Sequence, residues 1–324
     1  MKTTFVVIFL FFLFLDSPAD AQELYVYGGT VRHSETGDTS YTWGFEYLEW
    51  LGEHSAFSIS WLNEGHLPDD RRDGQSFQFW GGTTVYDQRL VLAAGIGPYF
   101  YYDTVKATDD GSRNTRGLAA LFSLTATWHI ENSWLIQLRA NFVETQSSLD
   151  TGALAIGVGY QLDPSPLPGP AAGTTPQVKN TRSREIMLLA GRTIINKFDT
   201  PTATAVAVEY RQDMGRHLEW TIGWLSQGND HRTYRGGPLT QLWLVRTFFN
   251  ECMSLGAGAG VHIDFLREDP NPNDEKITTF AAVTSITAAY RCYEHWLVRL
   301  SWNRVITDYH RDADVIMGGF GYRF

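Results

Sequence analysis

The chain is short of cysteine and of charge, and each shortage excludes a class of protein. Two cysteines in 324 residues exclude a disulfide scaffold and a CxxC metal centre. Charged residues make up 19% of the chain, below the roughly 25% usual in soluble proteins. Lys and Arg number 26 against 36 Asp and Glu, without a basic run, so nucleic acid is a poor candidate partner. Abundant aromatics (14%) exclude a disordered chain.

Catalytic signatures are also missing. The sequence has no G-x-S-x-G, P-loop or H-E-x-x-H motif. Its glycine-rich stretches, Gly95-x-Gly97 and Gly256-x-Gly258-x-Gly260, fall inside predicted strands. There an inward glycine makes room for an opposite side chain or eases the curvature of a sheet. We therefore predict no enzyme, no cofactor and no metal.

Long apolar runs are absent after the first residues. Phe5–Leu15 is an apolar stretch behind Lys2, shorter than the about 20 residues of a membrane-spanning helix. Ala19-Asp20-Ala21 then matches the pattern of small residues at a signal-peptide cleavage site. These features predict a signal peptide over residues 1–21 and an exported mature chain beginning at Gln22.

The rest of the chain consists of segments of about ten residues in which apolar residues alternate with small or polar ones, as in the strands of transmembrane barrels. Tyr41, Trp43, Phe45 and Tyr47 share one face of such a segment, and small or polar residues share the other. We count eight candidate strands before residue 163 and eight after residue 184. Between them, tight turns alternate with longer polar connections, expected at 34–40, 65–74, 104–117, 145–151, 196–203, 228–238, 267–276 and 307–313.

Bulky residues on one face and small ones on the other favour a membrane barrel over a soluble β-sandwich, whose large residues point inward. The chain ends Gly319-Phe-Gly-Tyr-Arg-Phe324. This ending resembles the terminal strand signal of Gram-negative outer-membrane β-barrels. The resemblance implies location in that membrane, recognition by the barrel-assembly machinery, and contact with outer-membrane lipid and lipopolysaccharide.

The mature sequence is duplicated. Glu46 and Trp61 recur as Glu209 and Trp224, each 163 positions later. We assign a first eight-strand repeat to 22–162 and a second to 185–324. The intervening 163–184 contains five of the 12 prolines, which predicts an extended spacer on the periplasmic side.

Two architectures fit this repeat. The copies can close together into one antiparallel up-and-down transmembrane barrel of 16 strands with pseudo-twofold symmetry, wide enough for a channel. Alternatively, each copy closes alone as a filled eight-strand barrel, which the long spacer and the small inward residues favour. Fused duplications are an accepted route to larger barrels, and on that ground we expect the single barrel.

Four ionisable residues fall on the predicted inward faces and are candidates for the barrel lumen. Inside a barrel such groups either form a salt-bridged plug or line a polar path. The four residues are Glu46, Arg139, Glu209 and Arg299.

The densest charged connection is a second candidate site. Its carboxylates could bind a divalent cation and its arginines could pair with lipopolysaccharide phosphates, although an ordinary charged surface loop has the same composition. Its candidate residues are Glu64, His66, Asp69, Asp70, Arg71, Arg72 and Asp73.

The two cysteines, Cys252 and Cys292, are predicted at periplasmic turns two strands apart. Two strand spacings make about 10 Å, beyond the roughly 7 Å that a disulfide tolerates. A bridge would therefore require movement of the turns.

These features favour a channel or exporter for polar solutes or polymer. The alternative is a non-conducting structural or lipopolysaccharide-binding barrel. A lipid hydrolase ranks third, because the lipid A deacylases among eight-strand barrels carry a His and a Ser two apart on the penultimate strand. The corresponding strands here, 134–142 and 296–304, lack such a pair.

Overall fold

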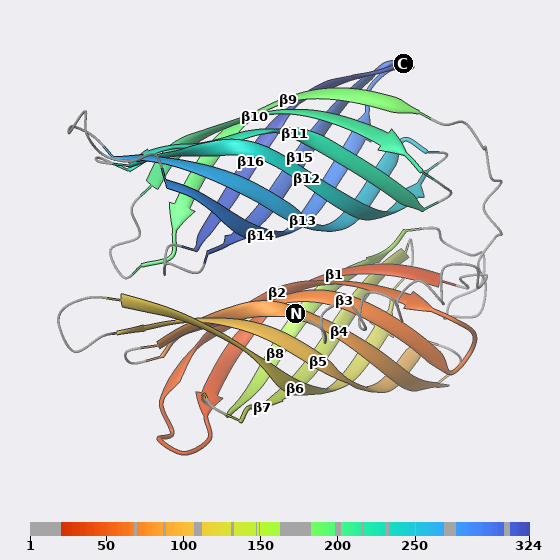
Figure 1. Cartoon of the computed structure of the whole chain (residues 1–324). Coiled ribbons are helices and arrows are strands. Elements are labelled where there is room, and N and C mark those ends of the chain that lie inside the picture. The colour runs from red at the N-terminus through yellow and green to blue at the C-terminus, as the bar shows by residue number, and fades with distance from the viewer. Residues whose placement is uncertain are drawn as a thin grey trace. The chain divides into compact units, whose positions relative to one another are not determined.

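The computed structural model describes most of the mature chain. The described residues are 21–67, 70–86, 89–106, 112–130, 133–146, 148, 150–162, 183–197, 202–214, 217–230, 233–249, 251–268, 277–307 and 312–324. Apart from Ala21, Ser183 and Arg184, the predicted signal peptide and spacer lie outside them. The chain divides into two compact units, each formed by antiparallel strands (Figure 1).

The first unit, barrel 1, is a closed sheet of eight strands in chain order. Strand β1 pairs with β2 on one side and with β8 on the other. The strands are β1 Ala21–His33, β2 Thr39–Trp50, β3 Ser55–Leu67, β4 Asp70–Val85, β5 Leu90–Lys106, β6 Ser112–His129, β7 Trp134–Glu144 and β8 Thr151–Gln161.

The second unit, barrel 2, repeats this topology, with β9 paired to both β10 and β16. Its strands are β9 Arg184–Ile195, β10 Thr202–Asp213, β11 Leu218–Asp230, β12 Thr233–Phe248, β13 Met253–Glu268, β14 Ile277–Arg291, β15 Trp296–Ile306 and β16 Ala313–Arg323. In each barrel we call the end where the first two strands connect the loop end, and the opposite end the turn end.

The sixteen antiparallel strands are confirmed, but our expectation of one 16-strand barrel is wrong. The alternative, two eight-strand barrels, is what the structure contains. The register runs from Glu23 opposite Gln161 to His33 opposite Thr151. Because this pairing uses the free edges of β1 and β8, neither edge is left to join the second repeat.

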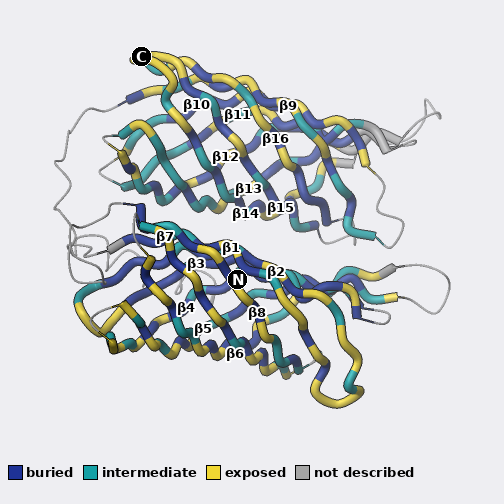
Figure 2. Tube along the Cα trace, turned by 180° about the vertical axis from the view of Figure 1, so that it is seen from behind, coloured by how far each residue is buried: buried dark blue, intermediate teal, exposed yellow. Residues whose placement is uncertain are grey.

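Burial alternates along the strands with apolar residues outside. On β7, Leu135, Gln137, Arg139 and Asn141 are buried, whereas the intervening residues from Trp134 to Phe142 are exposed or half-buried. Figure 2 shows the same alternation of buried and exposed positions along neighbouring strands. The polar residues of these strands point inward, the reverse of a soluble barrel.

The interior of barrel 1 is filled by aromatic side chains that we did not predict there, since we expected mainly small inward residues. They include Tyr25, Tyr27, Trp80, Tyr99 and Tyr101, all at most 4% exposed. The sequence alone does not show whether an aromatic residue on β1 or β5 points into the barrel or toward its outer face. The barrel is therefore packed rather than hollow.

Inward glycines accommodate these rings, as predicted. A Cβ atom added to Gly95 would lie 2.6 Å from the ring of Trp80, and one added to Gly258 would lie 2.5 Å from that of Trp243. Gly95 pairs with Trp80 and Gly258 with Trp243 across neighbouring strands. The same glycine–tryptophan contact thus occurs in both barrels.

The segment 65–74 is not the long connection that we expected. Strand β3 continues to Leu67 and β4 begins at Asp70. The register shifts between Asn63 and His66, where Gly65 has a positive φ of 73°. This bulge bends the strand without ending it, and glycine adopts the required conformation without a Cβ penalty.

The described part of the chain contains no helix that is long and apolar enough to cross a membrane.

The contact between Gly95 and Trp80 can be tested by Gly95→Ala. The added methyl group must displace a buried ring, and such overpacking costs about 1–3 kcal/mol. We expect a lower urea midpoint for the refolded protein. The matched control is Gly152→Ala, whose Cβ would meet no atom closer than 3.8 Å; equal effects of the two substitutions would contradict the packing argument.

Candidate functional site: the polar interiors of the barrels

A buried ion pair occupies the middle of barrel 1. Arg139 on β7 donates from Nη1 and Nη2 to the two carboxylate oxygens of Glu46 on β2, at 2.8 and 2.7 Å. Both side chains are fully buried. The guanidinium lies 4.6 Å from the ring centre of Tyr27 and 5.3 Å from that of Trp80. This bidentate pair joins two strands across the lumen.

Hydrogen bonds extend the pair into a network. Arg139 Nε donates to Asn141 Oδ1 at 3.0 Å, and Ser123 donates to the same oxygen at 2.8 Å. Ser58 donates to Glu46 at 3.0 Å and accepts from Trp80 Nε1 at 2.8 Å. Charges and polar groups in the centre are therefore satisfied by one another, and together they plug barrel 1.

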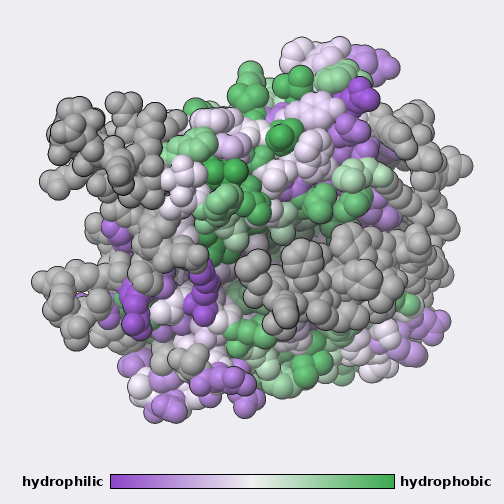
Figure 3. All heavy atoms as spheres, viewed as in Figure 1, coloured by the Kyte–Doolittle hydropathy of each residue, from purple (hydrophilic) through white to green (hydrophobic). Residues whose placement is uncertain are grey.

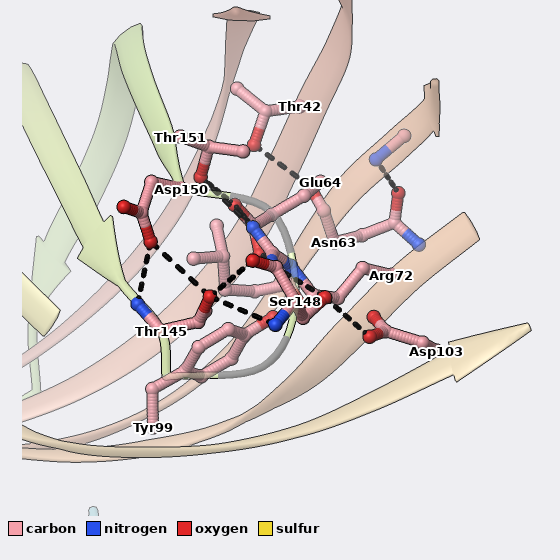
Figure 4. A network of polar contacts seen from close by, with 12 residues as sticks. Thr42, Asn63, Glu64, Arg72, Tyr99, Asp103, Thr145, Ser148, Asp150 and Thr151 are labelled. Atoms are coloured by element: carbon pink, nitrogen blue, oxygen red, sulfur yellow. Dashed lines mark hydrogen bonds and ion pairs between the residues drawn. The ribbon is translucent and has the colours of Figure 1, made fainter. Parts of the chain in front are cut away.

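A second network closes barrel 1 toward its loop end (Figure 4). Arg72 donates to both carboxylate oxygens of Glu64, at 2.5 and 2.9 Å, and to Thr151 at 3.1 Å. Ser148, in the β7–β8 connection, donates to Asp103 Oδ2 at 2.6 Å. The network links β3, β4, β5 and β8.

The expected binding loop is not assembled as one exposed surface, and that interpretation is wrong for Glu64 and Arg72. Both are buried and pair with each other, because the bulge keeps this segment in the sheet. Asp70 is also buried. The exposed His66 ring lies 5.5 Å from the Tyr41 ring.

The remaining candidates of that loop are placed differently. Arg71 and Asp73 are half-buried and alternate with the inward Asp70 and Arg72, and Asp69 lies outside the described residues. Among the described residues no group of three or more His, Cys, Asp or Glu could hold a metal ion.

Asp103 is a site residue that sequence reasoning missed. Burial, followed by the charge of Asp70, raises the pKa of its carboxyl from 3.8 to about 7, although the Ser148 hydrogen bond and the charge of Arg72 oppose the shift. Its Oδ1 has no hydrogen-bond partner. Asp103 accepts a hydrogen bond from Ser148. Ser148 follows Glu144, the first charged residue beyond the apolar outer residues of β7. The Asp103 carboxyl therefore lies beyond the apolar outer face.

Barrel 2 repeats part of the central network. Gln241 Nε2 donates to Ser285 at 2.6 Å, and Ser285 donates to Asn303 Oδ1 at 2.7 Å. In barrel 1, Gln78 donates to Ser123 at 3.0 Å, which bonds Asn141. The duplication thus extends to the interior hydrogen bonds.

The two lumen candidates of barrel 2, Glu209 and Arg299, are buried but do not form the pair seen in barrel 1. Ser301 stands at the repeat position of Arg139. Arg299 instead donates to Glu185 at 2.7 Å. Among the described residues no ion pair joins Glu209 to an arginine, although it interacts electrostatically with Arg211.

The ion pairs of barrel 2 are formed differently: Arg211 and Glu219 stand at the repeat positions of Leu48 and Ala56, and Arg235, at that of Arg72, has another carboxylate partner. Arg211 donates to Glu219 at 3.1 Å and its guanidinium lies 4.1 Å from the ring centre of Trp243. Toward the loop end, Arg235 donates to Asp264 at 3.1 Å. Barrel 2 therefore holds these ion pairs toward its two ends.

Cys252 directly precedes β13 and Cys292 directly follows β14, and these two strands are adjacent in the sheet, so the cysteines are one strand spacing apart and not two. The backbone N–H of Arg291, the residue before Cys292, donates to the backbone oxygen of Cys252 at 2.7 Å. Both thiols are free and exposed.

No protein-family model and no curated protein sequence matches the chain. Among solved structures, the N-terminal β-barrel domain of Pseudomonas aeruginosa OprF is 12% identical, with a TM-score of 0.37, and the match covers 44% of this chain and 98% of that one. Yersinia pestis Ail, the attachment invasion locus protein, is 10% identical with a TM-score of 0.35, covering 44% and 99%. The CymD monoaromatic hydrocarbon channel is 9% identical with a TM-score of 0.26, covering 96% and 91%.

The plug can be tested by removing one partner. Arg139→Met leaves Glu46 buried without its counter-charge, and such a loss costs about 3–5 kcal/mol. We expect a large drop in the urea midpoint of folded protein in detergent. Adding Glu46→Met should recover most of it, because no charge is then left unpaired; no recovery would show that packing, not charge pairing, sets the cost.

The raised pKa of Asp103 predicts a pH dependence of known sign. The folded state binds a proton at a pH where the unfolded chain has released it, so the free energy of unfolding should rise as the pH falls from above 7 toward 4. Asp103→Asn should flatten this part of the curve. Ser148→Ala, which removes a hydrogen bond to the carboxylate, should shift the rise to higher pH, and an unchanged curve in both variants would refute the assignment.

Proposed function

We propose that the protein is an integral β-barrel protein of a Gram-negative outer membrane, and that neither barrel is a wide solute pore. The observation that carries this proposal is the inverted polarity of the strands. Buried ion pairs such as Glu46–Arg139 lie inside, whereas large apolar side chains cover the outside. Water would favour the opposite arrangement, and a bilayer favours this one.

Both barrels carry this apolar outer face. On barrel 1 it includes Leu138 (60% exposed) and Ile156 (65%), and on barrel 2 Leu188 (63%) and Phe320 (69%). In the face drawn in Figure 3, hydrophobic residues gather between more hydrophilic ends. Exposure of so many apolar groups marks a surface that is covered by another phase or partner.

The height of the apolar face suits an outer membrane. Along β7 it runs from Trp134 to Phe142 and stops at Glu144. Because barrel strands are tilted, the length along the strand is the relevant measure: these nine residues match the about 9–11 residues of a tilted transmembrane β-strand.

Aromatic pairs mark the turn end of each barrel. Trp134 packs against Tyr160, and Trp296 packs against Tyr322, each pair with ring centres 5.3 Å apart. Their positions correspond in the two repeats. Tyr and Trp gather where a membrane meets water, so these pairs support an interfacial girdle.

The interior argues against the wide channel that the sequence pattern favours. An eight-strand barrel is only wide enough for side chains to fill it, and in barrel 1 they do. The non-conducting structural barrel, the alternative that the sequence leaves open, is the better proposal. We assign it no catalytic activity, outer-membrane lipid and lipopolysaccharide as neighbours, and assembly through its C-terminal strand.

Location and orientation can be tested with the native thiols. Cells are first treated with a reductant, so that both thiols are free. If the turn end faces the periplasm, Cys252 and Cys292 should then react with a membrane-impermeant maleimide only after the outer membrane is permeabilised. The protein should fractionate with outer membranes. Labelling of intact cells would reverse the orientation, and recovery in the soluble fraction would refute the proposal.

Membrane insertion predicts that the outer face rejects charge. Leu138→Arg places a cation on the lipid-facing surface, which costs about 2–4 kcal/mol near the bilayer centre. We expect poor folding into lipid vesicles, read from the heat-dependent mobility of the folded form in gels. Leu138→Val is the control and should fold normally; normal folding of the arginine variant would mean that Leu138 does not face lipid.

A further inference from the structure

Barrel 1 carries three long basic side chains on its outer surface near the loop end. They come from the neighbouring strands β4, β5 and β6, and we call them the basic row: Arg71, Lys106 and Arg116. Each has the same parity along its strand as an exposed apolar residue of the outer face: Phe79, Ile96 and Leu118. Because residues of equal parity share one face of a strand, the basic row points away from the plugged interior.

Arg71 and Lys106 are neighbours across the β4–β5 pair. Arg71 lies opposite Thr104, and Lys106 is two residues further along the same face of β5. Such diagonal positions are about 7–8 Å apart, within reach of long side chains. On its other side Arg71 lies opposite His66 of β3, whose side chain is exposed. One anionic group above this pair can therefore contact both charges, and His66 can donate a further hydrogen bond.

Arg116 extends the basic row onto β6. A Cβ atom added to Gly117 would contact the ring of Tyr101, so these two residues are cross-strand neighbours. Antiparallel pairing then places Arg116 beside Tyr102 on the outer face. Arg116 is exposed, and the next outward residue along β6 is Leu118, which is 49% exposed. The basic row therefore borders the apolar outer face.

Positive charge exceeds negative charge on this surface. Among the described residues of β3 to β7, two carboxylates point outward, those of Asp73 and Glu144. Asp73 is two residues from Arg71, whereas Glu144 lies opposite Ala120, four residues from Arg116. Three basic groups thus face two carboxylates, one of them well separated from the row, and the surface attracts anions.

The basic row occurs in one repeat only. Its repeat positions in barrel 2 hold Tyr234, Asp269 and Thr278. Barrel 2 has one arginine in this set, Arg267 at the repeat position of Thr104, and Asp269 offsets its charge. The strands of barrel 2 form without the basic row, so the fold itself does not require these residues in barrel 1.

A basic row that borders an apolar face fits an anionic lipid. Guanidinium groups bind phosphate oxygens in a bidentate manner, and the lysine ammonium adds a mobile point charge. The adjacent apolar side chains offer a surface for acyl chains. Lipopolysaccharide in the outer leaflet of an outer membrane carries its phosphates on the sugars to which its acyl chains are attached, so one molecule presents both features.

We propose that the basic row of barrel 1 binds the phosphate groups of a lipopolysaccharide molecule whose acyl chains lie on the apolar face beside Leu118. This site rests on the membrane location proposed above, in which the loop end meets the outer leaflet. It makes the first repeat the one that binds lipopolysaccharide.

The test is the affinity of the refolded mature chain for lipopolysaccharide in a zwitterionic detergent. The probe is fluorescently labelled lipopolysaccharide that consists of lipid A and the inner sugars, and binding is read from fluorescence anisotropy. The triple substitution Arg71→Gln, Lys106→Gln and Arg116→Gln removes the basic row. We expect the affinity to fall about fivefold for each charge lost, and about a hundredfold for all three.

The matched control removes three other exposed charges, with Arg32→Gln, Arg184→Gln and Arg192→Gln. Its affinity should equal that of the wild type, because these residues lie outside the basic row. An equal loss in both triple variants would reveal a general effect of net charge and overturn the site.

Two further ligands identify the group that is bound. Lipopolysaccharide stripped of its phosphates should bind the wild type no better than it binds the variant without the basic row; stronger binding would overturn the phosphate contact. Phosphatidylglycerol should bind the wild type more weakly than lipopolysaccharide does. Equal affinity would mean that any anionic lipid suffices and would overturn the choice of lipopolysaccharide.

Gel mobility and vesicle insertion separate failure of this site from failure of the membrane assignment. Protein that folds and inserts, yet binds lipopolysaccharide equally well with and without the basic row, overturns the site alone. Wild-type protein that does not insert overturns the membrane assignment.

Single substitutions of Arg116 cover the case in which the triple variant does not fold. Arg116→Gln removes one exposed charge and should weaken binding about fivefold. Arg116→Lys keeps the charge and should retain most of the affinity. Unchanged affinity in Arg116→Gln would exclude Arg116 from the site and overturn the basic row as its basis.

Discussion

The pairing of the first strand with the last in each repeat is the constraint on which the rest of the structure depends. In barrel 1 it joins β1 to β8 over eleven residue pairs, and in barrel 2 it joins β9 to β16 over eleven more. Once both edges are used, each sheet has no exposed backbone groups along its sides. Each outer face is then available for apolar side chains, and each interior has a small, fixed volume.

That fixed volume has been filled in two ways. In barrel 1, arginine–carboxylate pairs and rings occupy the lumen, with Arg139 between Tyr27 and Trp80. In barrel 2, Ser301 replaces the central arginine, and the ion pairs Arg211–Glu219 and Arg235–Asp264 lie toward the two ends. The shared Gln–Ser–Asn hydrogen bonds and the shared glycine–tryptophan contact show a common frame. Within it, exchange of a few inward residues changes a sealed core into a more polar one.

Much of this fold could be predicted from local patterns. Period-two alternation yields the strands, and the matches at a constant spacing yield the two copies. Closure could not be predicted, because the pairing of β1 with β8 joins residues far apart in the chain, and the strand pattern is the same in one large barrel and in two small ones. The linker and the small inward residues favour separate barrels, whereas fused duplications in larger barrels favour a single one, and the strand pattern does not decide between them.

Only part of the candidate site can be predicted from the sequence. The alternation of each strand identifies Glu46 and Arg139 as inward residues. The same alternation does not place Glu64 and Arg72 in strands, because the bulge at Gly65 interrupts it where the strand continues. Asp103 was missed because its environment is created by Asp70 and Ser148, which come from other strands and connections.

Disulfide trapping tests the central claim, separate closure of the two repeats, most directly. In a background with Cys252→Ser and Cys292→Ser, the pair Val26→Cys and Val158→Cys lies opposite on β1 and β8. The structure predicts that this pair cross-links on mild oxidation of the folded protein, and that Val26→Cys with Phe320→Cys does not. Cross-linking of β1 to β16 in place of β8 would contradict separate closure and restore a single large barrel.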